Sequence, residues 1–241
     1  MADRFAQFAD GELVFTVSEF RRLVSAGGAA SPDPGWVLRL GQGVEPGDLD
    51  TLKAAAGIDP AVGGLPVPPA TVHKCRAENV LLAGLEQHSE VRCTADLRVH
   101  RDNELILDHN TGRHLSGLVI IEAMRQLCTA HFETSYRRAL PAGDYAGIWH
   151  RMSLDFENFL FVLPAQVTCE IAEVDLGRKG HLRFRALTAV RQNNEDVASA
   201  EMQYSMVLRQ RVDALERYRA AQAVRRHMAT AVRAHDLGVE G

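Results

Sequence analysis

A narrow line of polar residues lies within the most apolar segment of the sequence, GLVIIEAMRQLCTAHFE (117–133). The polar positions recur every three or four residues: Glu122, Arg125, Gln126, Thr129 and Glu133. Residues at this spacing share one face of a helix, so the line would run along an otherwise apolar rod.

This line has two interpretations. If it faces solvent, Glu122 and Arg125 form a weak surface ion pair. If it faces a cleft, Glu122 is a carboxyl group in a largely apolar site, where desolvation would tend to raise its pKa and Arg125 would oppose that rise. A carboxyl group of this kind is suited to general acid or base catalysis.

The loop before the segment adds further reactive groups. His109 and His114 are side chains that can titrate near neutral pH. Ser116 is placed to cap the helix, and Gly117 lies where the loop meets it. A helix N-terminus also leaves backbone N–H groups free, which can polarise a carbonyl or hold an anion. This combination favours a catalytic or binding site over a surface stripe.

The remaining pattern indicates the elements that must position these groups. Residues 93–100 alternate apolar and polar, and a helix is predicted over roughly 116–138. Four further strand-like segments follow: 148–156, 165–174, 181–190 and 198–208. Consecutive alternating strands form an antiparallel sheet with one face covered, and the helix is the natural cover. The predicted fold class is α+β, with the sheet wrapped around one central helix.

The first 70 residues are predicted to form a separate, partly irregular extension. Seven of the nine prolines fall at or before Pro69. The extension is expected to hold a short strand at Leu13–Val17, followed by a short helix that Ser18 caps and Gly27–Gly28 end.

The last part of the chain, 210–241, is predicted to carry another helix, and the main domain is placed at 71–209. Seven arginines lie between Arg209 and Arg233. Three interpretations remain open: a surface helix docked on the domain or on a partner copy, a basic arm that contacts an acidic carrier protein, or a nucleic-acid contact. The net charge of −4 argues against nucleic-acid binding over the whole surface.

The common motifs of metal and nucleotide chemistry are absent from the sequence. It has no G-x-S-x-G elbow, Walker loop, H-E-x-x-H or strand-linked G-x-G-x-x-G, so neither a metal nor a nucleotide cofactor is expected. Four cysteines without a C-x-x-C pair indicate reduced thiols in a cytoplasmic protein. No signal peptide is expected, and no apolar run approaches the ~18 residues that span a bilayer. His73 and His100 are expected to be ordinary surface or strand residues.

Three stretches resemble one family of hotdog-fold proteins. They are VHKCRAENVLL (72–82), DHNTGRHLSGLVIIEAMRQ (108–126) and MSLDFENFL (152–160), and together they span about 72–208. The second is similar to the central-helix motif of hotdog proteins that act on acyl thioesters. The first favours the A-factor synthase (AfsA-like) family over fatty-acid dehydratases.

The resemblance implies an activity and a pair of functional residues. In the A-factor type, a β-ketoacyl group passes from an acyl carrier protein to an acceptor resembling dihydroxyacetone phosphate, on the way to a butyrolactone or butenolide signal. The family's Glu and Arg fall on Glu122 and Arg125. In the dehydratase branch, the catalytic pair would fall on His109 and Glu122. A third alternative is a non-catalytic module that binds acyl groups.

The sequence departs from the family pattern in ways that leave the acceptor open. Asn110 stands where the family usually has Pro, and Ser116–Gly117 stands in place of Pro-Gly. The family usually has two hotdog modules in tandem, whereas this chain has one. One module per chain predicts a homodimer with equivalent sites between the copies.

The resulting hypothesis places a thioester, on a phosphopantetheine arm or on CoA, between the subunits. Backbone N–H groups of Gly117 and Leu118 would hold the thioester oxygen. Glu122 would act as general acid or base, and Arg125 would orient Glu122 or bind a phosphate. The remaining residues expected to bind substrate are His114, Ser116 and Gln126.

Overall fold

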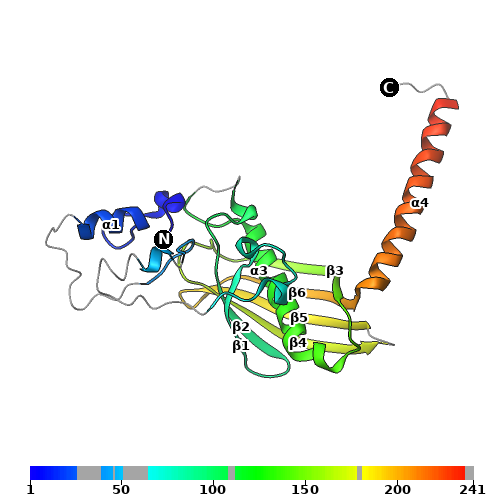
Figure 1. Cartoon of the computed structure of the whole chain (residues 1–241), viewed down its shortest axis with the longest axis horizontal. Coiled ribbons are helices and arrows are strands. Elements are labelled where there is room, and N and C mark those ends of the chain that lie inside the picture. The colour runs from blue at the N-terminus through cyan, green and yellow to red at the C-terminus, as the bar shows by residue number, and fades with distance from the viewer. Residues whose placement is uncertain (26–38, 46, 51–64, 108–111, 178–180, 237–241) are drawn as a thin grey trace.

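The computed structural model describes residues 1–25, 39–45, 47–50, 65–107, 112–177 and 181–236. Its centre is a six-stranded antiparallel sheet with the helix α3 lying across one face (Figure 1). The strands are β1 (Leu82–Gln87), β2 (Arg92–Leu97), β3 (Tyr145–Phe156), β4 (Gln166–Gly177), β5 (His181–Gln192) and β6 (Glu195–Leu208). The helices are α1 (Val17–Ser25), α3 (Gly117–His131) and α4 (Arg209–Asp236), with a π-helical turn η5 (Phe132–Tyr136) and the 3-10 turns η1 (Asp3–Phe8), η2 (Pro69–Val72), η3 (Ala77–Asn79), η4 (Glu104–Ile106) and η6 (Arg137–Ala139).

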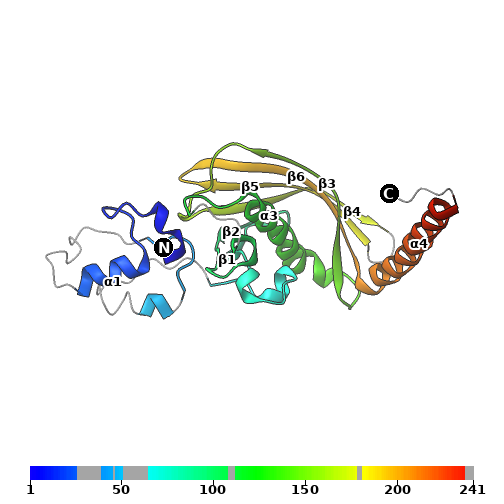
Figure 2. The same ribbon diagram turned by 90° about the horizontal axis from the view of Figure 1, so that it is seen from above.

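The sheet has the strand order β1-β2-β4-β5-β6-β3, so β1 and β3 are its edges. Seen from above, the sheet curls around α3 (Figure 2). This arrangement confirms the predicted α+β fold of a sheet wrapped around a central helix, and the five strand segments predicted between residues 93 and 208 all overlap observed strands. Strand β1 was not predicted, because its sequence LAGLEQ lacks regular alternation.

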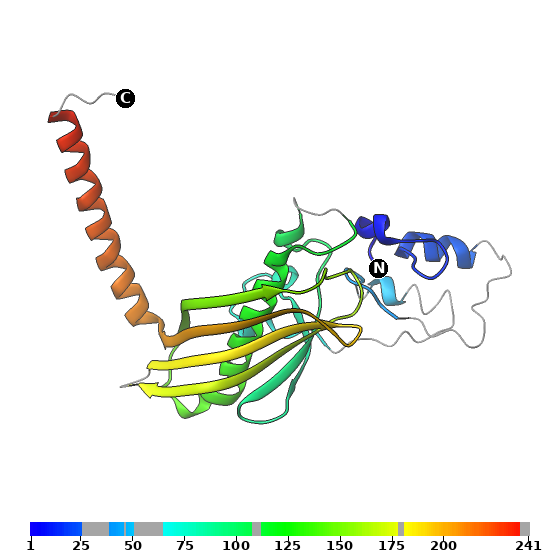
Figure 3. The same cartoon turned by 180° about the vertical axis from the view of Figure 1, so that it is seen from behind.

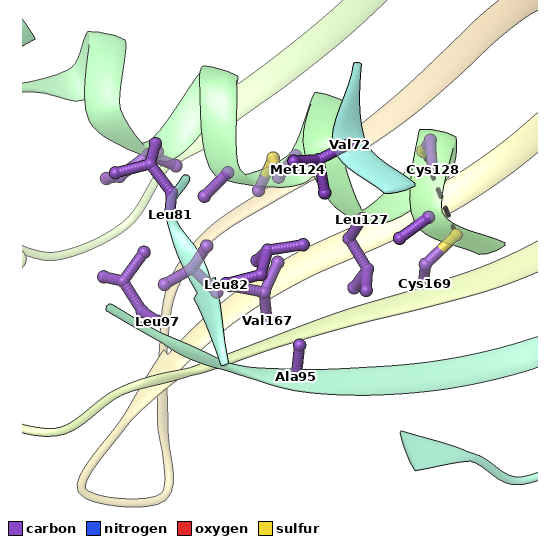
Figure 4. Packing of buried hydrophobic residues seen from close by; sticks show 14 of the residues in the cluster. Val72, Leu81, Leu82, Ala95, Leu97, Met124, Leu127, Cys128, Val167 and Cys169 are labelled. Carbon is purple, nitrogen blue, oxygen red and sulfur yellow. Dashed lines mark hydrogen bonds between the residues drawn. The ribbon is translucent and has the colours of Figure 1, made fainter. Parts of the chain in front are cut away.

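The core forms between α3 and the inner face of the sheet. Along β5, alternate side chains are buried, as the period of two in a strand requires. Met124 and Leu127 of α3 are fully buried and lie near Leu82 and Val167 (Figure 4). Burial of each such side chain stabilises the fold by about 1.5–3 kcal/mol. The packing fixes which face of α3 remains for polar groups.

The N-terminal residues differ in detail from their prediction. No strand forms over residues 13–17, because the Asp10 carboxylate accepts the N–H groups of Glu12, Leu13 and Val14 and makes a turn there. That prediction was wrong. The helix α1 does form, and the expected end at Gly27–Gly28 lies outside the described residues.

The cap of α1 is Thr16 rather than Ser18. Thr16 Oγ1 accepts the Glu19 N–H at 3.1 Å, and Glu19 Oε2 accepts the Thr16 N–H at 2.8 Å. This reciprocal pair is a capping box. Phe5 is fully buried in the same hydrophobic cluster as α3, while the division of the chain into 1–70, 71–209 and 210–241 stays a prediction.

The C-terminal helix α4 does not dock on the sheet. It leaves the end of β6 and extends away from the domain (Figures 1 and 3). Leu215, Tyr218, Val224 and Met228 are 47–62% exposed, so the predicted docking on the chain's own domain is wrong. None of the described helices, α4 included, is long and apolar enough to cross a bilayer.

Candidate functional site

Glu122 lies at the centre of a cluster of hydrogen-bond donors. Arg125 donates from Nε to Oε2 at 2.7 Å and from Nη2 to Oε1 at 2.8 Å. Lys74 Nζ lies 2.7 Å from Oε1, and Gln126 Nε2 donates to the same oxygen at 3.0 Å. One carboxylate therefore binds two cations, in addition to an amide.

The pKa of Glu122 shifts downward, against the expected rise. Burial raises the pKa, but the hydrogen bonds and charge of Arg125, together with hydrogen bonds from Lys74 and Gln126, outweigh burial and lower the pKa from 4.5 to about 2. The expectation was wrong because the sequence indicated one cation and the fold supplies two. At neutral pH Glu122 is ionised and has no proton to donate as a general acid.

The second cation reaches Glu122 from the covering segment, residues 72–81, which lies along the polar face of α3. His73 has a left-handed backbone conformation with φ of 54°, which is uncommon for a residue with a Cβ atom. From this turn Lys74 reaches Glu122, while His73 Nε2 lies 2.8 Å from Glu133 Oε1. Two side chains of one turn thus bind one acidic residue of α3 and one of the following turn η5.

Gln126 fixes the other end of the covering segment to α3. Its side chain is fully buried. Its Oε1 accepts the Leu81 N–H at 2.8 Å, and its Nε2 donates to the Asn79 carbonyl at 2.8 Å. Since the second N–H of Nε2 binds Glu122, both donors of the amide are used within the protein. Its predicted role in substrate binding stays a prediction.

The polar line of α3 therefore faces the covering segment, which matches neither sequence interpretation in full. The side chains of Glu122, Arg125 and Lys74 nevertheless remain 18%, 24% and 28% exposed. They lie at the boundary between packed protein and solvent.

The start of α3 brings together the other predicted binding residues: His114, Ser116, Gly117 and Leu118. Ser116 occupies the N-cap position, but its side chain makes no capping hydrogen bond, so the predicted cap was wrong. Its Oγ is buried and has no hydrogen-bond partner among the described residues. His109 lies outside the described residues, and its predicted role stays a prediction.

Aromatic residues surround this end of α3. Phe156 and Phe159 are 56% and 66% exposed, and the Phe159 ring lies 5.0 Å from that of His114. Phe156 approaches Gly117 so closely that a Cβ atom there would lie 2.8 Å from Cζ of the ring. Only glycine lets the Phe156 ring lie this close to the helix start.

Lys74 and His73 were missed as site residues by the sequence reasoning. They lie far from Glu122 and Glu133 in the chain, so no spacing rule connects them. The only signal was the VHK stretch, which the family resemblance used for classification and not for the site.

The family comparison identifies the larger part of the chain. The model of the A-factor biosynthesis hotdog domain, AfsA, matches residues 60–208, more than half of the sequence. The chain belongs to the AfsA family. The resemblance stated from the three motifs is thereby confirmed.

Several solved structures resemble this AfsA-family protein, but their sequence identity to it is low. An uncharacterised Pyrococcus horikoshii protein has 15% identity and a TM-score of 0.40 over 60% of this chain and 95% of its own. A mutant Pseudomonas aeruginosa thioesterase has 11% identity and a TM-score of 0.38 over 51% and 79%. A hypothetical thioesterase of Streptococcus pneumoniae, solved with coenzyme A, has 11% identity and a TM-score of 0.37 over 52% and 84%. No curated protein matches the sequence.

The ion cluster makes stability depend on acid pH. The pKa of Glu122 is about 2 in the fold against 4.5 ordinarily, so its contribution is complete above pH 4.5 and is lost as the pH falls towards 2. The contribution is at most about 3 kcal/mol. In urea unfolding from pH 7 to 3, the wild type should lose more stability than Glu122→Gln. If the free energies of unfolding of the two proteins fell by the same amount over this pH range, the ion pairs of Glu122 would not stabilise the fold.

The Gly117–Phe156 contact gives a double-mutant prediction. Gly117→Ala should destabilise the wild type, because the new Cβ would lie 2.8 Å from the ring. In a Phe156→Ala background the same change should stabilise by up to about 1 kcal/mol, because Ala is the better helix former. Urea unfolding of the four proteins measures this change of sign. An equal effect in both backgrounds would show that the ring does not constrain Gly117.

Proposed function

We propose that this AfsA-family protein transfers a β-ketoacyl group from an acyl carrier protein or CoA thioester to a small phosphorylated acceptor. The product class would be a signal such as a butyrolactone, or another secondary metabolite, made in the cytoplasm. The observation that carries the proposal is the pairing of one carboxylate with two partly exposed cations in the AfsA domain. This arrangement leaves one surplus positive charge beside the start of α3.

The cations have donors left for a phosphate. Within the described part of the chain, Arg125 uses Nε and Nη2 for Glu122 and the Val72 carbonyl, so both N–H groups of Nη1 remain. Lys74 uses one of its three N–H groups for Glu122. Glu122 holds the two cations side by side, and a phosphate would bind Lys74 Nζ and Arg125 Nη1.

The thioester would lie at the start of α3. The N–H groups of Gly117 and Leu118 would hold the thioester oxygen as negative charge develops on it. The acceptor hydroxyl attacks the carbonyl carbon, a C–O bond forms, the C–S bond breaks, and the hydroxyl proton ends on the leaving thiol. Glu122 lies five residues after Gly117 along the helix, about 7.5 Å by axial rise. A thioester at the start of α3 and a phosphorylated acceptor beside the two cations of Glu122 would thus lie close enough to react.

The lowered pKa changes the role proposed for Glu122. Its carboxylate is a weak base at neutral pH because its pKa is about 2, and its main role is to orient Arg125 and Lys74. A histidine of the loop before α3 would instead accept the hydroxyl proton. The dehydratase alternative, which uses Glu122 as a proton donor or acceptor, is less favoured for the same reason.

The proposed assembly is a homodimer joined along β3. This strand is an edge of the sheet, and its backbone can pair with a second copy. Met152 and Phe156 are 36% and 56% exposed along it. A two-fold axis would pair the two β3 strands antiparallel and cover these apolar side chains. The start of each α3 would then face the interface through Phe156.

One observation favours a second candidate, a non-catalytic acyl-binding module. Arg125 binds both oxygens of Glu122, which is the geometry of a structural ion pair. Such a module would bind thioesters without turnover.

The reaction is tested with a panel of substrates. β-Ketoacyl and 3-hydroxyacyl thioesters, on holo carrier protein and on CoA, are incubated with dihydroxyacetone phosphate and analysed by mass spectrometry. We expect an ester of the phosphorylated acceptor, formed only from β-ketoacyl donors, and no ester with Glu122→Gln. Loss of water from the 3-hydroxyacyl donors would support the dehydratase, and binding without any product would support the acyl-binding module.

Lys74 is tested by the split between KM and kcat. Lys74→Met should raise KM for the phosphorylated acceptor about 10- to 100-fold, because a charge-assisted hydrogen bond contributes about 1.5–3 kcal/mol. Lys74→Arg keeps the charge and should retain most of the affinity for this acceptor. Arg76→Met removes a more exposed cation, paired with Glu104, and serves as the matched control. The phosphate role fails if Lys74→Met affects phosphorylated and unphosphorylated acceptors equally.

A further inference from the structure

The helix α4 is a long arm with few contacts to the domain. It has 28 residues, which corresponds to about 40 Å at 1.5 Å per residue. Its attachment includes the Arg209 N–H, which donates to the Asp144 carbonyl at 2.8 Å. Between residues 214 and 228, every side chain except that of Gln222 is exposed. Figures 1 and 3 show the helix extending away from the sheet.

The arm and the body have opposite charge. Residues 209–228 hold six arginines and two acidic residues, a net charge of +4. The whole chain has 27 basic and 31 acidic residues, of which residues 209–241 hold seven and four. Residues 1–208 therefore hold 20 basic and 27 acidic residues, a net charge of −7. The arm thus has a net positive charge, whereas the rest of the chain has a net negative charge.

A free-standing helix of this kind gains stability from a partner. Most helical stability in proteins comes from packing and not from intrinsic propensity, and Tyr218, Val224 and Met228 are more than half exposed. Pairing of two α4 helices would bring two charges of +4 together. It would also place Arg225 in the seam, four residues after Ala221 and three before Met228. The partner that fits is an acidic surface with some apolar groups.

We infer that α4 is the docking element for an acidic acyl carrier protein that delivers the thioester. This inference rests on the proposed function, which requires a thioester donor. Positive charge on an exposed arm speeds the encounter with an acidic partner. The exposed apolar residues Tyr218, Val224 and Met228 would supply the packed contact.

The proposed homodimer places α4 beside the site that it would serve. Tyr145 pairs with Leu208 at the α4 end of β3, and Phe156 lies at the other end. Antiparallel pairing of two β3 strands brings the α4 end of one copy next to the partner's Phe156. That residue lies over the start of α3, where the thioester oxygen is held. A carrier bound to α4 of one copy would deliver its acyl group to the site of the other.

The test uses the full chain with three arginines reversed: Arg217→Glu, Arg219→Glu and Arg225→Glu. The matched control reverses three exposed arginines elsewhere: Arg22→Glu, Arg92→Glu and Arg183→Glu. We expect the α4 variant to bind holo acyl carrier protein at least about tenfold more weakly in calorimetry, with a matching rise in KM for the carrier-bound thioester. Turnover of the CoA thioester should stay unchanged, and the control should resemble the wild type.

Several results would overturn this inference. They are unchanged carrier binding in the α4 variant, an equal loss with the control, conversion of a dimer to a monomer by the α4 changes, or binding of the arm to phosphatidylglycerol vesicles in place of the carrier. The binding measurement needs no turnover. If no thioester reacts, the proposed function is wrong, but the binding measurement still tests whether α4 docks the carrier.

Discussion

The carboxylate of Glu122 joins the helix α3 to the covering segment at the point where both cations of the site meet. Arg125 on the same helix and Lys74 on the covering segment share its oxygens. Burial of an ionised carboxyl group is costly unless opposite charge and hydrogen bonds offset it. Here the two cations more than offset it, since the pKa falls to about 2. The placement of the covering segment and the charge of the site both depend on this balance.

The fold supplies that balance through packing on the opposite face of α3. Met124 and Leu127 are buried against the sheet, which fixes the rotation of the helix and turns its polar line towards residues 72–81. The left-handed turn at His73 then places one cation within reach. The same packing leaves Gly117 at the open end, close to Phe156 of the edge strand. Core, covering segment and edge strand together define one site.

Much of this architecture was predictable from the sequence because it rests on periodicity. The alternation in β5 reports burial directly, whereas in the apolar first turn of α3 Val119 and Ile120 are buried and Leu118 is exposed. The pairing of Lys74 with Glu122 was not predictable, because it depends on tertiary placement alone. The predicted direction of the Glu122 pKa shift was wrong for the same reason. Likewise, α4 carries apolar residues that the described part of the chain leaves exposed, and sequence pattern cannot distinguish such a helix from a docked one.

Glu122 is ionised at neutral pH between two cations at the edge of the site, and the proposed role of the site depends on this charge. Carbon NMR of the carboxyl groups, assigned with Glu122→Gln, measures its protonation directly. We expect this signal to stay constant from pH 7 to pH 4, since the pKa is about 2. A signal that titrates with a pKa at or above 4.5 would contradict it, and would restore Glu122 as a candidate for proton transfer.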